Sequence, residues 1–120
     1  MAAEGPRDYN ALIGEINEYS RKLVELIPET MHAFGKLADA AQGGKALDRK
    51  MKELMALSIA AAVHCQGCIA FHARGAVRAG ATREEVAEAL GIAIQMAGGP
   101  AVNSAADALR AFDQFAARAK

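Results

Sequence analysis

Residues 48–72 read DRKMKELMALSIAAAVHCQGCIAFH, and this stretch decides the fold. Asp48 is a favourable N-cap residue, so the sequence predicts a helix from about Arg49 to Val63. Apolar side chains occupy nearly every side of that helix. Because a helix that is apolar all round is normally surrounded by other elements, we expect this one to be the buried centre of a helical bundle.

Helical periodicity continues on both sides of this stretch, and prolines and glycines separate the segments. Thr82 and Glu85 have the spacing of a capping box, which marks the start of a helix. The further predicted helices run from Tyr9 to near Ile27, from Pro28 to Gly43, from Cys68 to Gly80, from Thr82 to Gly98 and from Gly99 onward. The alternating pattern of a β-strand is absent from the sequence. The predicted fold class is therefore all-α, with about five to six helices.

The length and composition of the chain favour a single globular domain. Residues 1–8 are expected to form a flexible leader, and residues 9–120 a single helical domain. The N-terminus lacks the apolar stretch of a signal peptide. The longest nearly apolar run, from Leu54 to Val63, has about half of the roughly 20 residues that a membrane helix needs. We therefore expect a cytoplasmic protein without a membrane partner.

Charge argues against nucleic-acid binding. The chain has 14 basic and 14 acidic residues, and the basic residues are scattered rather than clustered. A surface that follows phosphates would need a basic patch or stripe. Nucleic acid is therefore excluded as an expected partner.

Apolar residues make up 52% of the chain but aromatic residues only 5%, so small side chains such as alanine must fill much of the core. Such a core needs closely approaching helices or completion by a partner subunit. The apolar stripe from Leu12 to Leu26 is close to a heptad seam, which generally requires a facing helix. We therefore expect a homo-oligomer. The methionines are expected to fill gaps in the core rather than to form a ligand set; they include Met31, Met51, Met55 and Met96.

The chemistry centres on Cys65-Gln66-Gly67-Cys68. Two thiols at this spacing can close a disulfide without a long-range rearrangement. A helix N-terminus and a neighbouring imidazole would stabilise the reactive thiolate. His72 follows Cys68 by four residues, so both side chains share one face of a continuous helix and His72 can accept or donate the proton.

Two other interpretations of the cysteines are weighed against this one. Free cysteine is often buried, so the pair could be two small residues of an alanine-rich core. Alternatively, Cys65, Cys68, His72 and His64 could bind a metal ion. Zinc sites usually complete four ligands with a second, distant pair. The chain has no third cysteine, and His32 lies on a separate predicted helix, so we expect no metal.

Glu53 is the acidic residue that stands out, because it lies within an otherwise apolar helix. Composition favours a place at the solvent edge, which is the usual position of a charged residue. If the carboxylate is instead buried and faces the thiols, it suits proton transfer. His32 is expected to have no chemical role.

These residues resemble a known family. Glu53, the segment HCQGCIAFH at 64–72 and the segment AGATREEV at 79–86 are similar to the carboxymuconolactone decarboxylase-like superfamily, and more narrowly to the AhpD-type alkylhydroperoxidase core. The resemblance covers roughly Leu47 to Pro100. Its C-x-x-C-x-x-x-H element followed by G-A-T-x-E-E is more specific than a lone C-x-x-C.

The resemblance implies an all-helical fold assembled into homo-trimers or homo-hexamers, and thiol-dependent reduction of hydroperoxides. Residue by residue, it implies that Cys68 attacks the peroxide and that Cys65 resolves the sulfenic acid as a disulfide. It assigns His72 and Glu53 to a proton relay. This chemistry needs no bound cofactor. Regeneration is expected from an external dithiol, either a dihydrolipoyl or a thioredoxin-like protein.

The motif also departs from the family pattern at one position. The best-characterised members place a histidine directly before the second cysteine, where this chain has Gly67. His64, on the other side of Cys65, is a candidate substitute. A further tension concerns the attacking thiol, because thioredoxin-like motifs activate the first cysteine at a helix start whereas this family points to the second.

Two alternative functions accompany the peroxidase hypothesis. The first is an acid–base enzyme of the carboxymuconolactone decarboxylase type, although those enzymes lack the cysteine pair. The second is a non-catalytic, oligomeric redox sensor whose disulfide changes a partner interface.

Overall fold

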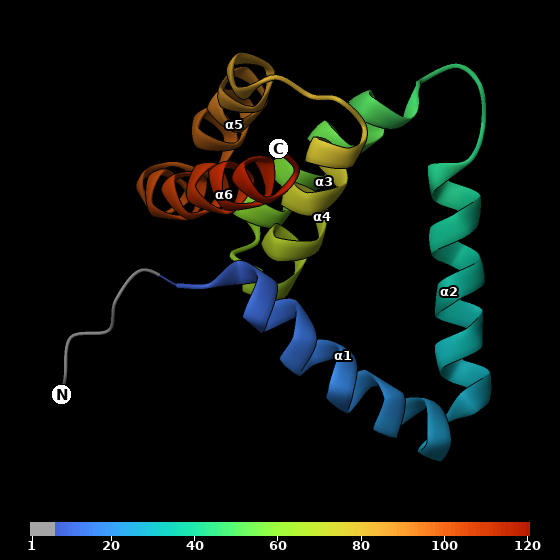
Figure 1. Cartoon of the computed structure of the whole chain (residues 1–120). Coiled ribbons are helices and arrows are strands. Elements are labelled where there is room, and N and C mark those ends of the chain that lie inside the picture. Colours follow the sequence, from blue (N-terminus) through green and yellow to red (C-terminus); the bar gives the residue numbers. More distant parts are fainter. Residues whose placement is uncertain (1–6) are drawn as a thin grey trace, which may run out of the picture.

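The protein is described here by a computed structural model, which describes residues 7–120 (Figure 1). The helices, in chain order, are α1 (Tyr9–Leu26), α2 (Pro28–Gln42), α3 (Arg49–Ala62), α4 (Gln66–Arg78), α5 (Arg83–Ala97) and α6 (Gly99–Arg118). Residues 7–120 contain no strand. The all-α prediction is confirmed, and α4 begins at Gln66, slightly before the predicted start at Cys68.

Side-chain caps explain where three of the helices begin. The Asp8 side chain accepts a hydrogen bond from the Ala11 amide and caps α1, and the Asp48 side chain caps α3 in the same way. Thr82 and Glu85 form the predicted capping box at the start of α5. Of the predicted leader, residues 1–6 lie outside the described residues, and Asp8 belongs to the cap of α1.

Helices α3, α4, α5 and α6 form the body of the protein, and α3 contacts each of the other three. Leu57, Ile69 and Val86 are fully buried in this body. Alanines such as Ala73 and Ala108 are also fully buried. Because an alanine projects only a methyl group, the helices can approach closely, and the body closes with few aromatic side chains.

Helices α1 and α2 form an arm that extends from the body (Figure 1). Helix α1 is anchored at its N-terminal half, where Tyr9 and Ile13 are buried. Its predicted apolar stripe continues into residues that are exposed, including Tyr19, Leu23 and Leu26. Helix α2 has no buried residue along its length. The arm therefore carries apolar side chains that the rest of the described chain leaves uncovered.

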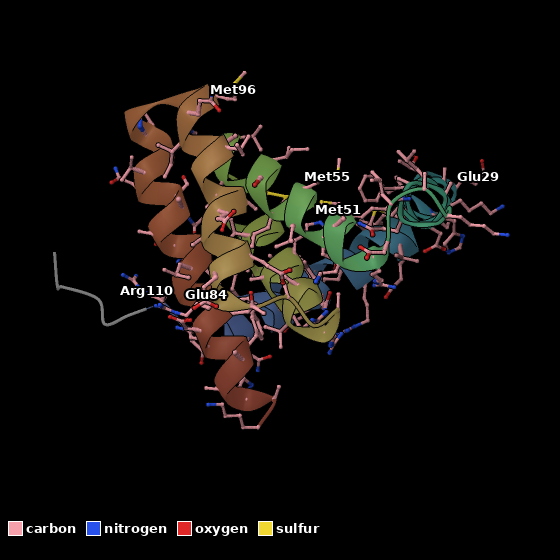
Figure 2. All side chains as sticks on the ribbon, turned by 90° about the horizontal axis from the view of Figure 1, so that it is seen from above. Glu29, Met51, Met55, Glu84, Met96 and Arg110 are labelled. Atoms are coloured by element: carbon pink, nitrogen blue, oxygen red, sulfur yellow. A yellow bond between two sulfur atoms is a disulfide. The ribbon has the colours of Figure 1, made fainter. Side chains whose placement is uncertain are left out.

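Helix α3 is not the fully surrounded centre that its composition predicts. Met51, Met55 and Ile59 are 45%, 46% and 60% exposed. The labelled Met51, Met55 and Met96 lie at the surface in Figure 2. The prediction that the methionines fill the core is therefore wrong for these three, because α4, α5 and α6 cover only part of the circumference of α3 and the end of α5 is open to solvent.

Candidate active site

The turn between α3 and α4 presents the two cysteines. In this turn His64 adopts the left-handed conformation, with φ at 59°. This conformation is uncommon for a residue other than glycine. The ring atom Nδ1 of His64 lies 2.7 Å from Oγ of Ser104, which is buried on α6. The contact with α6 therefore supports a turn that the backbone alone disfavours.

Cys65 and Cys68 form a disulfide across the first turn of α4, with their Cα atoms 5.2 Å apart. Cys65 is the N-cap residue of α4, and its Sγ accepts a hydrogen bond of 3.2 Å from the Cys68 amide. Cys68 is exposed and Cys65 is half-buried. The interpretation of the two cysteines as buried core residues is therefore wrong.

The start of α4 gives the two sulfur atoms different surroundings. The free N–H groups at a helix N-terminus carry a partial positive charge. After reduction, a thiolate on Cys65 would lie at this end and be stabilised by it. Cys68 is the cysteine that is more open to a dissolved oxidant. The charge at the helix end thus favours Cys65 as the thiolate. Solvent exposure favours Cys68 as the sulfur that reacts first, either with the oxidant or with a reductant.

Glu53 and His72 form a pair that joins α3 to α4. The Nδ1 atom of His72 lies 2.8 Å from Oε1 of Glu53. Glu53 is only 4% exposed, so the expectation that it lies at the solvent edge is wrong. It is buried because α4 covers it and because Gln42, the last residue of α2, donates a hydrogen bond of 3.5 Å to the same Oε1. The carboxylate is therefore buried together with hydrogen-bond partners, which offset the cost of its burial.

This pairing determines what the imidazole can do. When the Nδ1 proton is donated to the carboxylate, Nε2 of the neutral ring carries a lone pair and accepts protons. His72 lies one helical turn after Cys68, on the same face of α4. The His72 side chain remains 35% exposed, so the ring can exchange protons with a bound reactant or with water.

Helix α6 supplies two residues that the sequence did not single out. Nε2 of Gln66 donates a hydrogen bond of 3.1 Å to Oδ2 of Asp107. Together with the contact between His64 and Ser104, this bond attaches both neighbours of Cys65 to α6. Ser104 and Asp107 are three positions apart and therefore share one face of the helix. No local motif marks them, because their role arises from the way in which α6 packs on the turn.

Comparison with known proteins identifies the relatives of this chain. A sequence model of the carboxymuconolactone decarboxylase family matches residues 28–111. The chain belongs to this family. The fold of this family member is similar to that of apo-lpg0406, a carboxymuconolactone decarboxylase family protein from Legionella pneumophila. The two share a TM-score of 0.87 and 44% sequence identity, over 90% of this chain and 96% of that one.

Two relatives of this family member are uncharacterized proteins. One, from Cupriavidus necator, is 39% identical over 88% of this chain and 94% of its own length. The other, named uncharacterized protein 4 in cox locus, is from Paracoccus denitrificans. It is 38% identical over 69% of this chain and 75% of its own length. These relatives support membership of the carboxymuconolactone decarboxylase family but name no reaction.

The structure gives a physical account of Gly67, where this family member departs from the AhpD-type motif. A Cβ atom at position 67 would lie 2.8 Å from Cδ1 of Ile16, on α1. Real Cβ atoms essentially never approach another heavy atom so closely, so a larger residue requires Ile16 to move. The space beside the cysteines is therefore filled from α1 by an apolar side chain. His64, the candidate substitute, has its Nδ1 engaged by Ser104.

Two kinds of feature are absent from the part of this family member that the structure describes. Within residues 7–120, no three histidine, cysteine, aspartate or glutamate side chains are grouped so that they could hold a metal ion. In the same part of the chain, every helix is too short or too polar to traverse a lipid bilayer.

Proposed function

We propose that this protein is an AhpD-type thiol peroxidase that reduces hydroperoxides through Cys65 and Cys68. The observation that carries the proposal is the disulfide in the first turn of α4 with the Glu53–His72 pair on the next turn. A pair of sulfur atoms at a helix start and a buried carboxylate behind an imidazole are the groups that a dithiol peroxidase needs.

The reaction begins with the reduced dithiol. The Cys68 thiolate attacks one oxygen of the hydroperoxide, the O–O bond breaks, and the alkoxide leaves as an alcohol after it takes a proton. Cys68 is then a sulfenic acid. The Cys65 thiol then gives up its proton and attacks this sulfur, the S–O bond breaks, and the departing hydroxide takes that proton and leaves as water, so that the disulfide forms. Two electrons pass from the dithiol to the peroxide, which leaves the disulfide seen between Cys65 and Cys68.

His72 and Glu53 manage the protons in this scheme. His72 takes the thiol proton on Nε2 and returns it to the departing alkoxide. Glu53 accepts the hydrogen bond from Nδ1, so it holds the ring in one orientation and stabilises the imidazolium between these two transfers.

An external dithiol must reduce the disulfide before the next turnover. We propose a dihydrolipoyl or thioredoxin-like protein for this step, acting in the cytoplasm, where such carriers are kept reduced. The dithiol is oxidised to its own disulfide, and two protons pass to Cys65 and Cys68. The same proposal includes assembly as a homo-trimer or homo-hexamer.

The test compares the wild type with Cys65→Ser and Cys68→Ser after reduction. Each protein is mixed with an alkyl hydroperoxide, and peroxide consumption, dimedone labelling of sulfenic acid and protein mass are followed. We expect Cys68→Ser to lose peroxide-dependent oxidation, and Cys65→Ser to accumulate a labelled sulfenic acid at Cys68. The variant that lacks both cysteines is the control for uncatalysed loss of peroxide.

Two results would change the assignment. If both single variants consume peroxide like the wild type, the thiols are not the reactive groups. If the wild type forms the disulfide but does not turn over with any dithiol donor, the protein is a redox sensor and not a peroxidase. Labelling at Cys65 in Cys68→Ser would reverse the roles of the two cysteines, as the N-cap position of Cys65 favours.

A further inference from the structure

Gly75 is buried on α4, three residues after His72, and it lies directly against the Glu53 carboxylate. A Cβ atom at Gly75 would be 2.5 Å from Cδ of Glu53 and closer still to Oε2. It would be 3.2 Å from Oε1, the oxygen that faces His72. Because real Cβ atoms essentially never come within 3.0 Å of another heavy atom, this carboxylate occupies space that any side chain at position 75 would need.

At the other helical glycines no charged group is this close, and the Cβ position of Gly67 meets only the apolar end of Ile16. A Cβ atom at Gly14, Gly35 or Gly91 would meet nothing within 4 Å among the described residues. Glycine in the middle of a helix is unfavourable relative to alanine, so a buried glycine there needs a reason. At Gly75 the reason is the close approach of a charged group from α3.

The Glu53 carboxylate is thus held from several sides. His72 and Gln42 approach Oε1, and the bare backbone of Gly75 lies against Oε2. Glu53 is 4% exposed, so it has little solvent-filled space into which it could move. A displacement of the carboxylate would therefore break its hydrogen bond with the His72 ring.

We propose that Gly75 is a positioning residue for the proton relay. Because Gly75 has no side chain, the Glu53 carboxylate can occupy this space. In this position the carboxylate keeps the proton of neutral His72 on Nδ1, so that Nε2 can accept a proton. The consequence for turnover rests on the proposed function, since it assumes that His72 transfers the thiol proton. The consequence for the His72 ring does not.

The first experiment compares Gly75→Ala with Gly91→Ala, which makes the same change in a helix where the methyl group meets open space. After reduction, disulfide formation with an alkyl hydroperoxide is followed across a range of pH. Loss of a positioned acid or base typically slows a reaction by about 100-fold or more. We expect Gly75→Ala to slow oxidation by at least about tenfold and to change its pH profile, and Gly91→Ala to leave both unchanged.

A structural readout that does not depend on turnover is the ¹⁵N chemical shift of the His72 ring nitrogens. We expect the wild type to show the proton on Nδ1, and both Gly75→Ala and Glu53→Ala to shift it toward Nε2. Adding Gly75→Ala to Glu53→Ala should then change neither the ring shifts nor the oxidation rate further, since the two residues act through one carboxylate. The result for the ring shifts would hold even if the wild type consumed no peroxide, and that second finding would contradict only the proposed function.

Three outcomes would overturn the role of Gly75. The first is a wild-type tautomer of His72 in Gly75→Ala. The second is that Gly75→Ala slows oxidation by the same factor in the wild type and in the Glu53→Ala background. The third applies if Gly75→Ala does not fold. In that case the Glu53→Ala, Gly75→Ala double variant is compared with Glu53→Ala, because removal of the carboxylate leaves room for the added methyl group. If the double variant is less stable than Glu53→Ala, Gly75 is needed for a contact other than the one with Glu53.

Discussion

Tyr9 shows at the residue scale how a polar group in this small core depends on its surroundings. Its side chain is fully buried at the start of α1, and its hydroxyl has no hydrogen-bond partner among residues 7–120. Burial, followed by the nearby negative charge of Asp107, raises the pKa of Tyr9 to about 12. Asp107 also accepts the bond from Gln66, so Tyr9 and the redox turn share one acidic neighbour.

This shift makes stability depend on alkaline pH. The pKa of the Tyr9 phenol is higher in the folded chain than in the unfolded chain, where it stays near 10. Between these values the unfolded chain has released the proton and the folded chain has not, so rising pH favours unfolding. We expect urea unfolding of the wild type to become easier from about pH 10 upward, and Tyr9→Phe to reduce this loss. At pH 7 we expect Tyr9→Phe to change the free energy of unfolding by about 1 kcal/mol or less, because it removes an unpaired hydroxyl.

Tyr19→Phe is the matched control, because Tyr19 is 64% exposed on the same helix. Its alkaline profile should follow that of the wild type. An identical profile for Tyr9→Phe and the wild type would mean that the Tyr9 phenol does not remain protonated in the folded state.

At the scale of elements, α1 packs on α4 and places an apolar side chain beside the redox motif. Ile16 fills the space beside Gly67, in the first turn of α4. The glycine therefore has a packing reason in addition to any effect on chemistry. A side chain at position 67 and an isoleucine at position 16 compete for the same space.

This competition predicts an energetic coupling between the two helices. Gly67→Ala gains helix propensity but brings a methyl group against Cδ1 of Ile16. Ile16→Val removes that δ-methyl group, so Gly67→Ala should be more favourable by at least about 0.5 kcal/mol in the Ile16→Val background than in the wild type. Thermal and urea unfolding of the four proteins measure the coupling. Additive effects would show that Ile16 moves aside without cost.

At the scale of the whole molecule, residues 7–120 leave two apolar surfaces uncovered. One follows the arm, where Phe34 and Leu37 of α2 are exposed, and the other lies between α3 and α5. The radius of gyration is 14.9 Å, whereas about 13–14 Å is typical of a domain of this length. An extended arm and a contiguous apolar groove are common features of chains that assemble.

We therefore expect self-association through these surfaces. In analytical ultracentrifugation the wild type should sediment as an oligomer. Ile59→Lys, which places a charge in the apolar groove between α3 and α5, should shift the distribution toward the monomer at micromolar concentration. Ala106→Lys, an equally charged change at an exposed position of α6, is the control and should leave the mass unchanged. A wild type that is monomeric at high concentration would contradict this expectation.

Features that depend on residues close together in the sequence could be predicted, whereas features that depend on contacts between helices could not. The C-x-x-C spacing was enough to predict that Cys65 and Cys68 can pair, because both lie within one helical turn. The pairing of Glu53 with His72 needed the packing of α3 on α4, and composition alone placed Glu53 at the wrong depth. The apolar composition of α3 likewise predicted more burial than the packing of its neighbouring helices provides.

The sequence by itself determined the helices, the caps of α3 and α5 and the spacing of the redox pair. Prolines, glycines, capping side chains and apolar spacing act within a few residues, so their effects can be identified without a fold. Only the tertiary structure decided which carboxylate meets His72, why position 75 has no side chain, what fills the space beside Gly67 and which apolar faces stay open. These features depend on contacts between helices, and the residues on each side of such a contact carry no local mark of their partner.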